Sequence, residues 1–220
     1  MDTTAARRSI LARIRAAQGR DATPAVHERE AVADWLARHP EGPRPPMPDD
    51  LVEHFVQQAQ KMATTVDQVS GLAAVPAAVE RYLTSLGLPL RAIAWQTLDA
   101  FDWAGANLTI EFRTPHNDDL VGITGCFCAT AETGTLALLS GPDTWASAGL
   151  LPETHVAIVP ASRIVASHED AFALIRAERG ELPRAVNFVS GPSRTGDIEQ
   201  TIVLGAHGPY RVHAIVVHGA

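Results

Sequence analysis

Three short segments hold residue types that can carry chemistry, and the first surrounds a single glutamate. Residues 122–136 read Gly-Ile-Thr-Gly-Cys-Phe-Cys-Ala-Thr-Ala-Glu-Thr-Gly-Thr-Leu, so glycines and small residues enclose Glu132 just before a hydrophobic stretch at 135–140. A carboxylate at the edge of such a strand is a candidate acid, base or nucleophile. The alternative is a structural glutamate that caps neighbouring amides. The adjoining residues in this candidate site are Thr133, Gly134 and Thr135.

The second segment has the pattern of a strand, a Gly-Pro turn and a helix N-terminus. Residues 187–199 read Asn-Phe-Val-Ser-Gly-Pro-Ser-Arg-Thr-Gly-Asp-Ile-Glu, and Asp197 with Gln200 has capping-box spacing. A helix N-terminus after a parallel strand attracts anions, and Arg194 can hold a carboxylate or phosphate bidentately. The alternative is an arginine that pairs with a local carboxylate and stiffens the loop. The candidate anion-binding residues are Ser193, Arg194, Thr195 and Asp197.

The third segment is a tight turn, Gly-Ala-His-Gly-Pro at 205–209, that leads into a candidate strand. His207 can shuttle protons near neutral pH, although a loop histidine can equally be a local hydrogen-bonding group. Open parallel sheets bind ligands at the carboxyl ends of their strands. We therefore expect Glu132, Arg194 and His207 to line one cleft that binds a small anion.

Several cofactor motifs are missing from the sequence. No histidine pair has metal-ligand spacing, so no metal site is expected. Neither Gly-x-Gly-x-x-Gly nor a phosphate-loop Gly-Lys-Ser/Thr occurs, which argues against a self-contained NAD-dependent dehydrogenase. The two cysteines, Cys126 and Cys128, are too few for a four-thiolate iron–sulfur cluster. We expect them to be buried, reduced thiols.

Composition indicates a globular protein of ordinary makeup. The chain has 220 residues, of which 46% are hydrophobic and 20% charged, and its formal net charge is −7. The negative charge argues against nucleic acid as a partner. No apolar stretch approaches the length of a membrane span, and the N-terminus does not have the pattern of a signal peptide. We therefore expect a cytoplasmic protein.

The N-terminal part is predicted to be an arm. Residues 3–17 have the spacing of an amphipathic helix, and a short helix is expected around 31–38. Five prolines between 40 and 48 lack backbone donors and favour extended or turn geometry. We assign residues 1–48 to a helical and proline-rich arm and residues 49–220 to an α/β domain.

The domain pattern alternates helices with strands. It should begin at Asp50, which has capping-box spacing with Glu53. The alternation predicts an open, mostly parallel sheet with helices on both faces, and the apolar runs at 136–139 and 156–159 favour central strands. Helices are expected around 51–62, 75–86, 168–179 and 197–204, and strands around 63–69, 90–95, 120–124, 135–140, 155–160, 185–190 and 211–217.

The three segments together resemble the LUD-domain family, and within it the lactate-utilisation C branch. The similarity is strong over 120–217, weaker over 50–119, and does not extend to 20–48. It is carried, in the order of the family, by Gly-Ile-Thr-Gly and Ala-Glu-Thr-Gly-Thr-Leu within 122–136, Leu-Leu-Ser-Gly-Pro at 138–142, Ser-Gly-Pro-Ser-Arg-Thr-Gly-Asp-Ile-Glu at 190–199 and Leu-Gly-Ala-His-Gly-Pro at 204–209.

The resemblance implies both a fold and a role. The fold would be like that of the sugar-isomerase and CoA-transferase superfamily. The role would be in oxidation of L-lactate to pyruvate beside A- and B-type iron–sulfur proteins, with the clusters on those partners and no cofactor in this chain. A small carboxylate or other anion is the ligand that the Arg194 segment itself suggests. Glu132 resembles the catalytic glutamate of CoA transferases in its place, which is an analogy at the level of the fold.

Two other functions are compatible with the same residues. The chain can be a free-standing enzyme on an acyl, CoA or phosphosugar substrate, with Glu132 and the Arg194 loop at its active site. It can also be a non-catalytic scaffold subunit, whose loops are structural and whose arm contacts partners.

Overall fold

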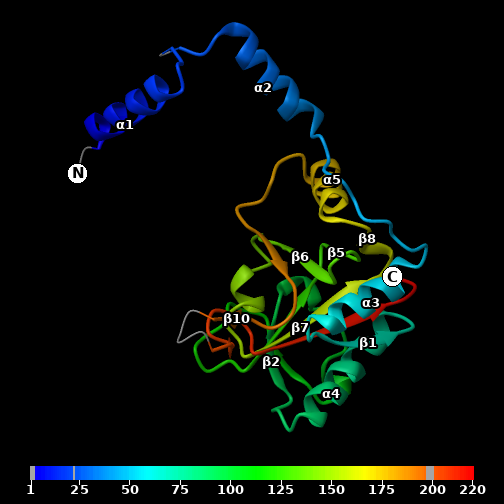
Figure 1. Cartoon of the computed structure of the whole chain (residues 1–220). Helices are drawn as coiled ribbons and strands as arrows, with labels where there is room; N and C mark the ends of the chain where they lie inside the picture. The colour runs from blue at the N-terminus through cyan, green and yellow to red at the C-terminus, as the bar shows by residue number, and fades with distance from the viewer. Residues whose placement is uncertain (1–2, 22, 197–200) are drawn as a thin grey trace. The chain divides into compact units, whose positions relative to one another are not determined.

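The computed structural model describes residues 3–21, 23–196 and 201–220, which form two compact units divided between Pro45 and Pro46 (Figure 1). The smaller unit contains α1 (Thr4–Ala17) and α2 (Val26–Arg38), and neither helix has a buried residue. α2 begins before the helix predicted at 31–38, because the Glu28 carboxylate accepts a hydrogen bond from the Ala25 amide at its N-terminus.

The larger unit alternates strands and helices along the chain. Its first helix begins after Asp50, as predicted, and the Asp50 carboxylate accepts a hydrogen bond from the Glu53 amide at 2.9 Å. The elements are α3 (Leu51–Lys61), β1 (Thr65–Val69), α4 (Val75–Ser85), β2 (Arg91–Ala94), β3 (Thr109–Glu111), β4 (Val121–Gly125), β5 (Cys128–Thr130), β6 (Thr135–Leu139), β7 (Thr154–Pro160), β8 (Ile164–Val165), α5 (His168–Arg179), β9 (Val186–Val189), β10 (Arg194–Thr195), β11 (Val203–Leu204) and β12 (Arg211–Val217), with short 3-10 helices η1 (Leu72–Ala74), η2 (Gln96–Leu98), η3 (Ala104–Ala106), η4 (Ala146–Gly149) and η5 (Ala161–Arg163).

The main sheet is parallel throughout. Within the described residues it has six strands in the order β1-β12-β7-β4-β2-β3. β7 and β12 lie inside it, and their apolar residues are buried on both faces, as expected for strands covered on two sides. The prediction of an α/β protein with a largely parallel sheet flanked by helices is therefore confirmed.

The two faces of the main sheet have different covers. On one face, α4 packs against β1 and β12, where the Tyr82 ring stacks on His213 at 3.8 Å and Arg81 pairs with Asp67. On the other face, η4 lies close to the sheet at Gly122, where a Cβ atom would be 2.1 Å from the Ala148 carbonyl oxygen. The missing side chain therefore permits this close contact.

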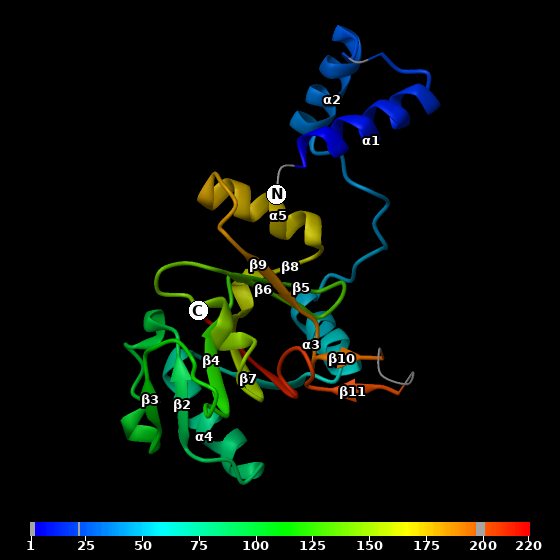
Figure 2. The same cartoon turned by 90° about the vertical axis from the view of Figure 1, so that its left-hand side faces the viewer.

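A second, smaller sheet lies between the main sheet and α5 (Figure 2). In the described part of the chain it contains four strands in the order β8-β5-β6-β9. Strands β6 and β9 correspond to the predicted strands at 135–140 and 185–190. They do not belong to the main sheet, as a single open sheet would require, because β6 pairs only with β5 and β9 among the described strands. Its apolar side chains are buried by α5 on one face and by the main core on the other.

The prediction of a helix at 197–204 is also wrong for residues 201–204, which the structure describes. Residues 203–204 form β11, which pairs antiparallel with β10, and residues 197–200 lie outside the described residues. The short strands β3, β5, β8, β10 and β11 were not predicted from the sequence. No helix of the described chain combines the length and apolarity needed to cross a membrane.

Candidate functional site

The three candidate segments meet beside the C-terminal end of α3. We use the name motif cluster for residues 132–135, 190–195 and 205–209 together with Met62. Two glycines allow the first two segments to touch this helix end. A Cβ atom on Gly134 would lie 2.2 Å from the Ala59 amide nitrogen, and one on Gly191 would lie 2.0 Å from the Met62 carbonyl oxygen. Both glycines also have positive φ, which favours glycine over other residues.

Hydroxyl groups join the first segment to the second. The register that pairs Leu136 with Val189 places Thr135 beside Ser190 at the same end of the second sheet. The Thr135 Oγ1 lies 2.6 Å from Ser190 Oγ and 2.7 Å from Thr133 Oγ1. The side chain of Thr133 in turn reaches Thr130 Oγ1 at 3.1 Å. A continuous chain of hydroxyls therefore runs from β5 to the segment that carries Arg194.

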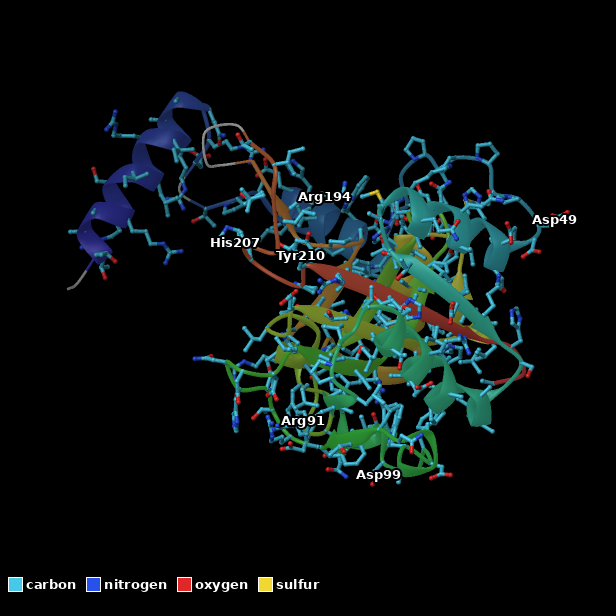
Figure 3. The ribbon with its side chains drawn as sticks, turned by 90° about the horizontal axis from the view of Figure 1, so that it is seen from below. Asp49, Arg91, Asp99, Arg194, His207 and Tyr210 are labelled. Carbon is cyan, nitrogen blue, oxygen red and sulfur yellow. The ribbon has the colours of Figure 1, made fainter. Side chains whose placement is uncertain are left out.

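Backbone hydrogen bonds join the second segment to the third. The Ser193 amide donates to the Pro209 carbonyl at 2.9 Å, and the Gly205 amide donates to the Ser193 carbonyl at 3.0 Å. The Ser193 Oγ accepts a hydrogen bond from the His207 amide at 3.3 Å. Figure 3 shows the side chains of Arg194 and His207 on these neighbouring segments.

Arg194 is anchored to the C-terminal end of α3. Its guanidinium donates to the Met62 carbonyl at 3.1 Å, and its side chain is exposed. Thr195 lies in β10 opposite Val203, and Asp197 lies outside the described residues. The helix N-terminus expected to bind the anion is therefore not part of the described cluster.

Glu132 lies at the tip of the turn between β5 and β6. Its amide donates to the Ala166 carbonyl at 3.0 Å, and its side chain is half-buried. The Thr135–Ser190 hydrogen bond links its segment to that of Arg194, and the Ser193–His207 hydrogen bond adds the third segment. The structure thus brings the three predicted segments together.

The motif cluster lies at a different edge from the one expected. The 205–209 turn precedes the amino end of β12, and Met62 precedes the amino end of β1. The expectation of a site at the carboxyl ends of the parallel strands is therefore wrong. The Arg194 segment does follow a strand end, but that strand, β9, belongs to the second sheet, whose strands run in mixed directions.

A separate cavity of about 770 Å³ opens at the carboxyl edge of the main sheet. We call it the carboxyl-edge cavity, and none of its lining residues belongs to the motif cluster. Sequence analysis missed it, although the residues that end or follow predicted strands were a usable signal. Its lining includes Trp95, Gly125, Cys126, Phe127, Pro160 and Arg163.

Both cysteines are free thiols, and Cys126 lines this cavity. The Cys126 Sγ donates to the Cys128 carbonyl at 2.7 Å. Burial raises the pKa of the Cys126 thiol well above its usual range and that of Cys128 to about 11. Both thiols therefore stay protonated. Cys128 is buried, as predicted, whereas Cys126 is only half-buried.

One group among the described residues can bring three ligand atoms to a common metal ion: His116, Asp118 and Asp119. Arg113 already contacts both carboxylate oxygens of Asp119, at 2.6 and 2.9 Å. Its hydrogen bonds hold the pKa of the Asp119 carboxyl below its usual range. The arginine therefore supplies the positive charge that a cation would otherwise bring.

Comparison with known proteins places these residues in a family. The family model described as the LUD domain matches residues 52–217. The chain is 42% identical over 100 residues to lactate utilization protein C of Bacillus licheniformis, covering 44% of this chain and 42% of that protein. The chain thus spans less than half the length of this relative. It is 32% identical over 171 residues to the protein of the same name from Macrococcus caseolyticus, covering 76% of this chain and 71% of that protein.

A solved structure shares the fold. The crystal structure of a DUF162 family protein from Deinococcus radiodurans matches with a TM-score of 0.58 and 21% sequence identity, covering 79% of this chain and 99% of that chain. The family model covers α3 through β12, which includes every residue of the motif cluster. The chain therefore belongs to the LUD-domain family.

Proposed function

We propose that this chain is a component of a cytoplasmic lactate-utilisation system and supports oxidation of L-lactate to pyruvate together with iron–sulfur partner proteins. The observation that carries the proposal is the assembly of the motif cluster. Its segments are distant in sequence and are joined by the Thr135–Ser190 and Ser193–His207 hydrogen bonds. The relatives that match over this region are named lactate utilization protein C.

Arg194 is the residue best suited to hold the carboxylate of lactate or pyruvate. Its hydrogen bond to the Met62 carbonyl fixes the position of the guanidinium beside α3. A guanidinium has five N–H donors in a planar fork, and the bond to the Met62 carbonyl uses only one of them. The hydroxyl of Ser193 and the nearby side chain of Thr195 come from the same segment and extend the polar surface.

The oxidation needs acceptors for protons and for electrons. Conversion of lactate to pyruvate releases a pair of electrons and a pair of protons, because one C–H bond and the O–H bond on the same carbon are broken. Glu132 and His207 are the members of the motif cluster that can take a proton. The electrons pass to partner proteins in this proposal, because this chain has two cysteines and an iron–sulfur cluster commonly takes four.

Binding measurements test the carboxylate site. Calorimetry with lactate, pyruvate and inorganic phosphate compares the wild type with Arg194→Ala, alone and with the partners present. Loss of a charge-assisted bidentate contact should weaken lactate or pyruvate binding by about 1.5–3 kcal/mol, roughly tenfold to a hundredfold. Arg194→Lys should restore only part of the affinity, because an ammonium lacks the planar fork. The matched control is Arg184→Ala, which removes an exposed arginine outside the motif cluster. Equal binding by wild type and Arg194→Ala contradicts the site.

Copurification tests the system. The full chain is tagged in its native host, and the copurifying proteins are assayed for iron, sulfide and lactate-dependent reduction of an artificial dye. Iron–sulfur proteins with lactate oxidation support the proposal. Turnover of acyl, CoA or phosphosugar substrates by the isolated chain favours the free-standing enzyme instead. Lactate oxidation that is unchanged by Arg194→Ala, while the complex still assembles, favours a scaffold.

A further inference from the structure

The carboxyl-edge cavity lies where three parallel strands end. Trp95 follows β2, Gly125 ends β4 and Pro160 ends β7, and all three residues line the cavity. Its lining also includes the end of β6, at Leu139 and Ser140, and the last turn of α5. The main sheet and the second sheet therefore border one open space, which is far larger than a three-carbon acid requires.

The strand order marks this edge as a binding position. β3, which follows β2 in the chain, lies on one side of β2. The chain leaves β4 in the opposite direction, because β7, the next strand of the main sheet, lies on the other side of β4. In open α/β sheets, ligands bind beyond the carboxyl ends of two adjacent strands whose connections diverge in this way. β2 and β4 are such a pair.

Two aromatic residues stand out in a lining that also holds polar and charged side chains. The Trp95 ring is held by a hydrogen bond from its indole N–H to the Trp145 carbonyl at 2.9 Å. A Cβ atom on Gly125 would meet the Trp95 ring at an ordinary contact distance of 3.6 Å. The Phe127 ring lies under two guanidinium groups, those of Arg163 at 4.6 Å and Arg179 at 5.7 Å from its centroid. All three of these residues line the cavity, and stacked planar groups of this kind suit a flat ligand.

The charges around the cavity do not favour an anion. The Arg163 guanidinium donates to the Phe127 carbonyl at 2.8 Å and pairs with Glu178. Of the other lining residues, Arg179 is cationic and Asp143 and Glu181 are anionic, so carboxylates outnumber guanidinium groups by three to two. An anionic ligand would therefore meet net repulsion, in contrast to the motif cluster, which presents Arg194.

We propose that the carboxyl-edge cavity is a second binding site, separate from the motif cluster, and that it takes an uncharged planar aromatic or heteroaromatic molecule. The ring of the ligand packs against the stacked planar groups of Phe127, Arg163 and Arg179, because Trp95 is only 4% exposed and offers little surface. This second site goes beyond the proposed role in lactate utilisation and does not depend on it, because the cavity shares no residue with the motif cluster.

Calorimetry with a pair of probes of equal shape tests the class of ligand. The probes are indole-3-carboxamide, which is neutral, and indole-3-carboxylate, which is an anion at pH 7.5. The amide should bind the full-length protein saturably, and the carboxylate should bind at least about threefold more weakly because of the surplus carboxylates. Absence of saturable amide binding, or tighter binding of the carboxylate, overturns the proposal.

Two substitutions at one position locate the site. Gly125→Ala adds an atom at ordinary contact distance and should change the affinity for indole-3-carboxamide less than about twofold. Gly125→Leu extends into the cavity and should weaken this affinity roughly tenfold or more. Arg194→Ala should leave the affinity for indole-3-carboxamide unchanged, which separates this site from the motif cluster. Amide binding that is the same in folded Gly125→Leu overturns the assignment.

Chemical-shift mapping on the wild type locates the bound probe without the need for a variant. Indole-3-carboxamide should shift the backbone amides of Gly125, Ser140 and Gly141, all of which line the cavity. Shifts confined to the motif cluster or to residues 3–45 overturn the proposal even if Gly125→Leu fails to fold.

Discussion

The motif cluster and the carboxyl-edge cavity differ in how their residues are held and in how visible they are in the sequence. In the motif cluster, polar side chains and glycines from three segments bind one another and the end of α3. In the cavity, rings and aliphatic groups at strand ends enclose space. Close backbone packing requires small residues at particular positions, so the sequence of such a region contains a recognisable motif. A cavity requires only that certain strand ends be neighbours, so its residues do not form a sequence motif.

The largest expected effect concerns the tight packing of the motif cluster. Gly134→Ala and Gly87→Ala both place a side chain at a φ near +65°, which costs about 1–2 kcal/mol. Only Gly134 also has backbone in the way, because its Cβ would lie 2.2 Å from the Ala59 nitrogen. Gly134→Ala should therefore lose about 1–3 kcal/mol more of the free energy of unfolding than Gly87→Ala. Urea denaturation measures both, and equal losses would show that the cluster is not tightly packed against α3.

The stability of the protein should depend on pH, because two histidines are buried in the main sheet. Burial lowers the pKa values of His155 and His213 to about 4. Both histidines are therefore neutral in the folded protein, whereas in the unfolded chain they take up protons below about pH 6.5. Stability is fully present above pH 6.5 and falls as the pH drops toward 4. The loss at pH 5 should be about 2 kcal/mol for each histidine.

A variant isolates one of these histidines. His155→Gln keeps a group that can bind Thr124, which lies 2.8 Å from the imidazole, but does not titrate. The difference in unfolding free energy between pH 7.5 and pH 5 should shrink by about half in this variant. His116→Gln, at an exposed position, should leave the difference unchanged. If His155→Gln also leaves it unchanged, His155 is not the source of the pH dependence.

The same substitution made in both regions compares their hydrogen bonding directly. Thr135→Val removes a buried hydroxyl that contacts Thr133 and Ser190, and should cost about 1–2 kcal/mol of unfolding free energy. Thr97→Val, at the exposed rim of the cavity, should change it by less than about 0.5 kcal/mol. Thermal or urea unfolding distinguishes these outcomes. A larger loss for Thr97→Val would reverse the contrast drawn between the two regions.

The smallest effect is expected from removal of the arm, since both regions lie in the larger unit. Neither α1 nor α2 has a buried residue, and Met47, which packs against the core, is retained when the chain starts at Pro46. Residues 46–220 should unfold cooperatively, with a free energy within about 0.5 kcal/mol of the full chain. An insoluble product, or one that melts without cooperativity, would place the arm in the core and contradict the proposed division.

Local patterns by themselves determined most elements and the three segments of the motif cluster, but not the part of Met62 in it. The capping residue Asp50, the apolar runs in β7 and β12, and the helix at 168–179 follow from side-chain chemistry and periodicity over a few residues. The three chemically suggestive segments were also found, because close packing restricts residue type wherever it occurs.

Only the tertiary structure decided how the strands are grouped and where the open space lies. The apolar run in β6 fits a central strand of either sheet, since burial on both faces is the same in the two. The chain passes from β4 into β5 through Cys126 and Phe127, and this crossing between sheets has no periodic signal. Strand order depends on contacts between residues far apart in sequence, which alternation along one segment cannot encode. The assembly of the whole domain therefore decided at which edge the motif cluster lies and at which edge the cavity lies.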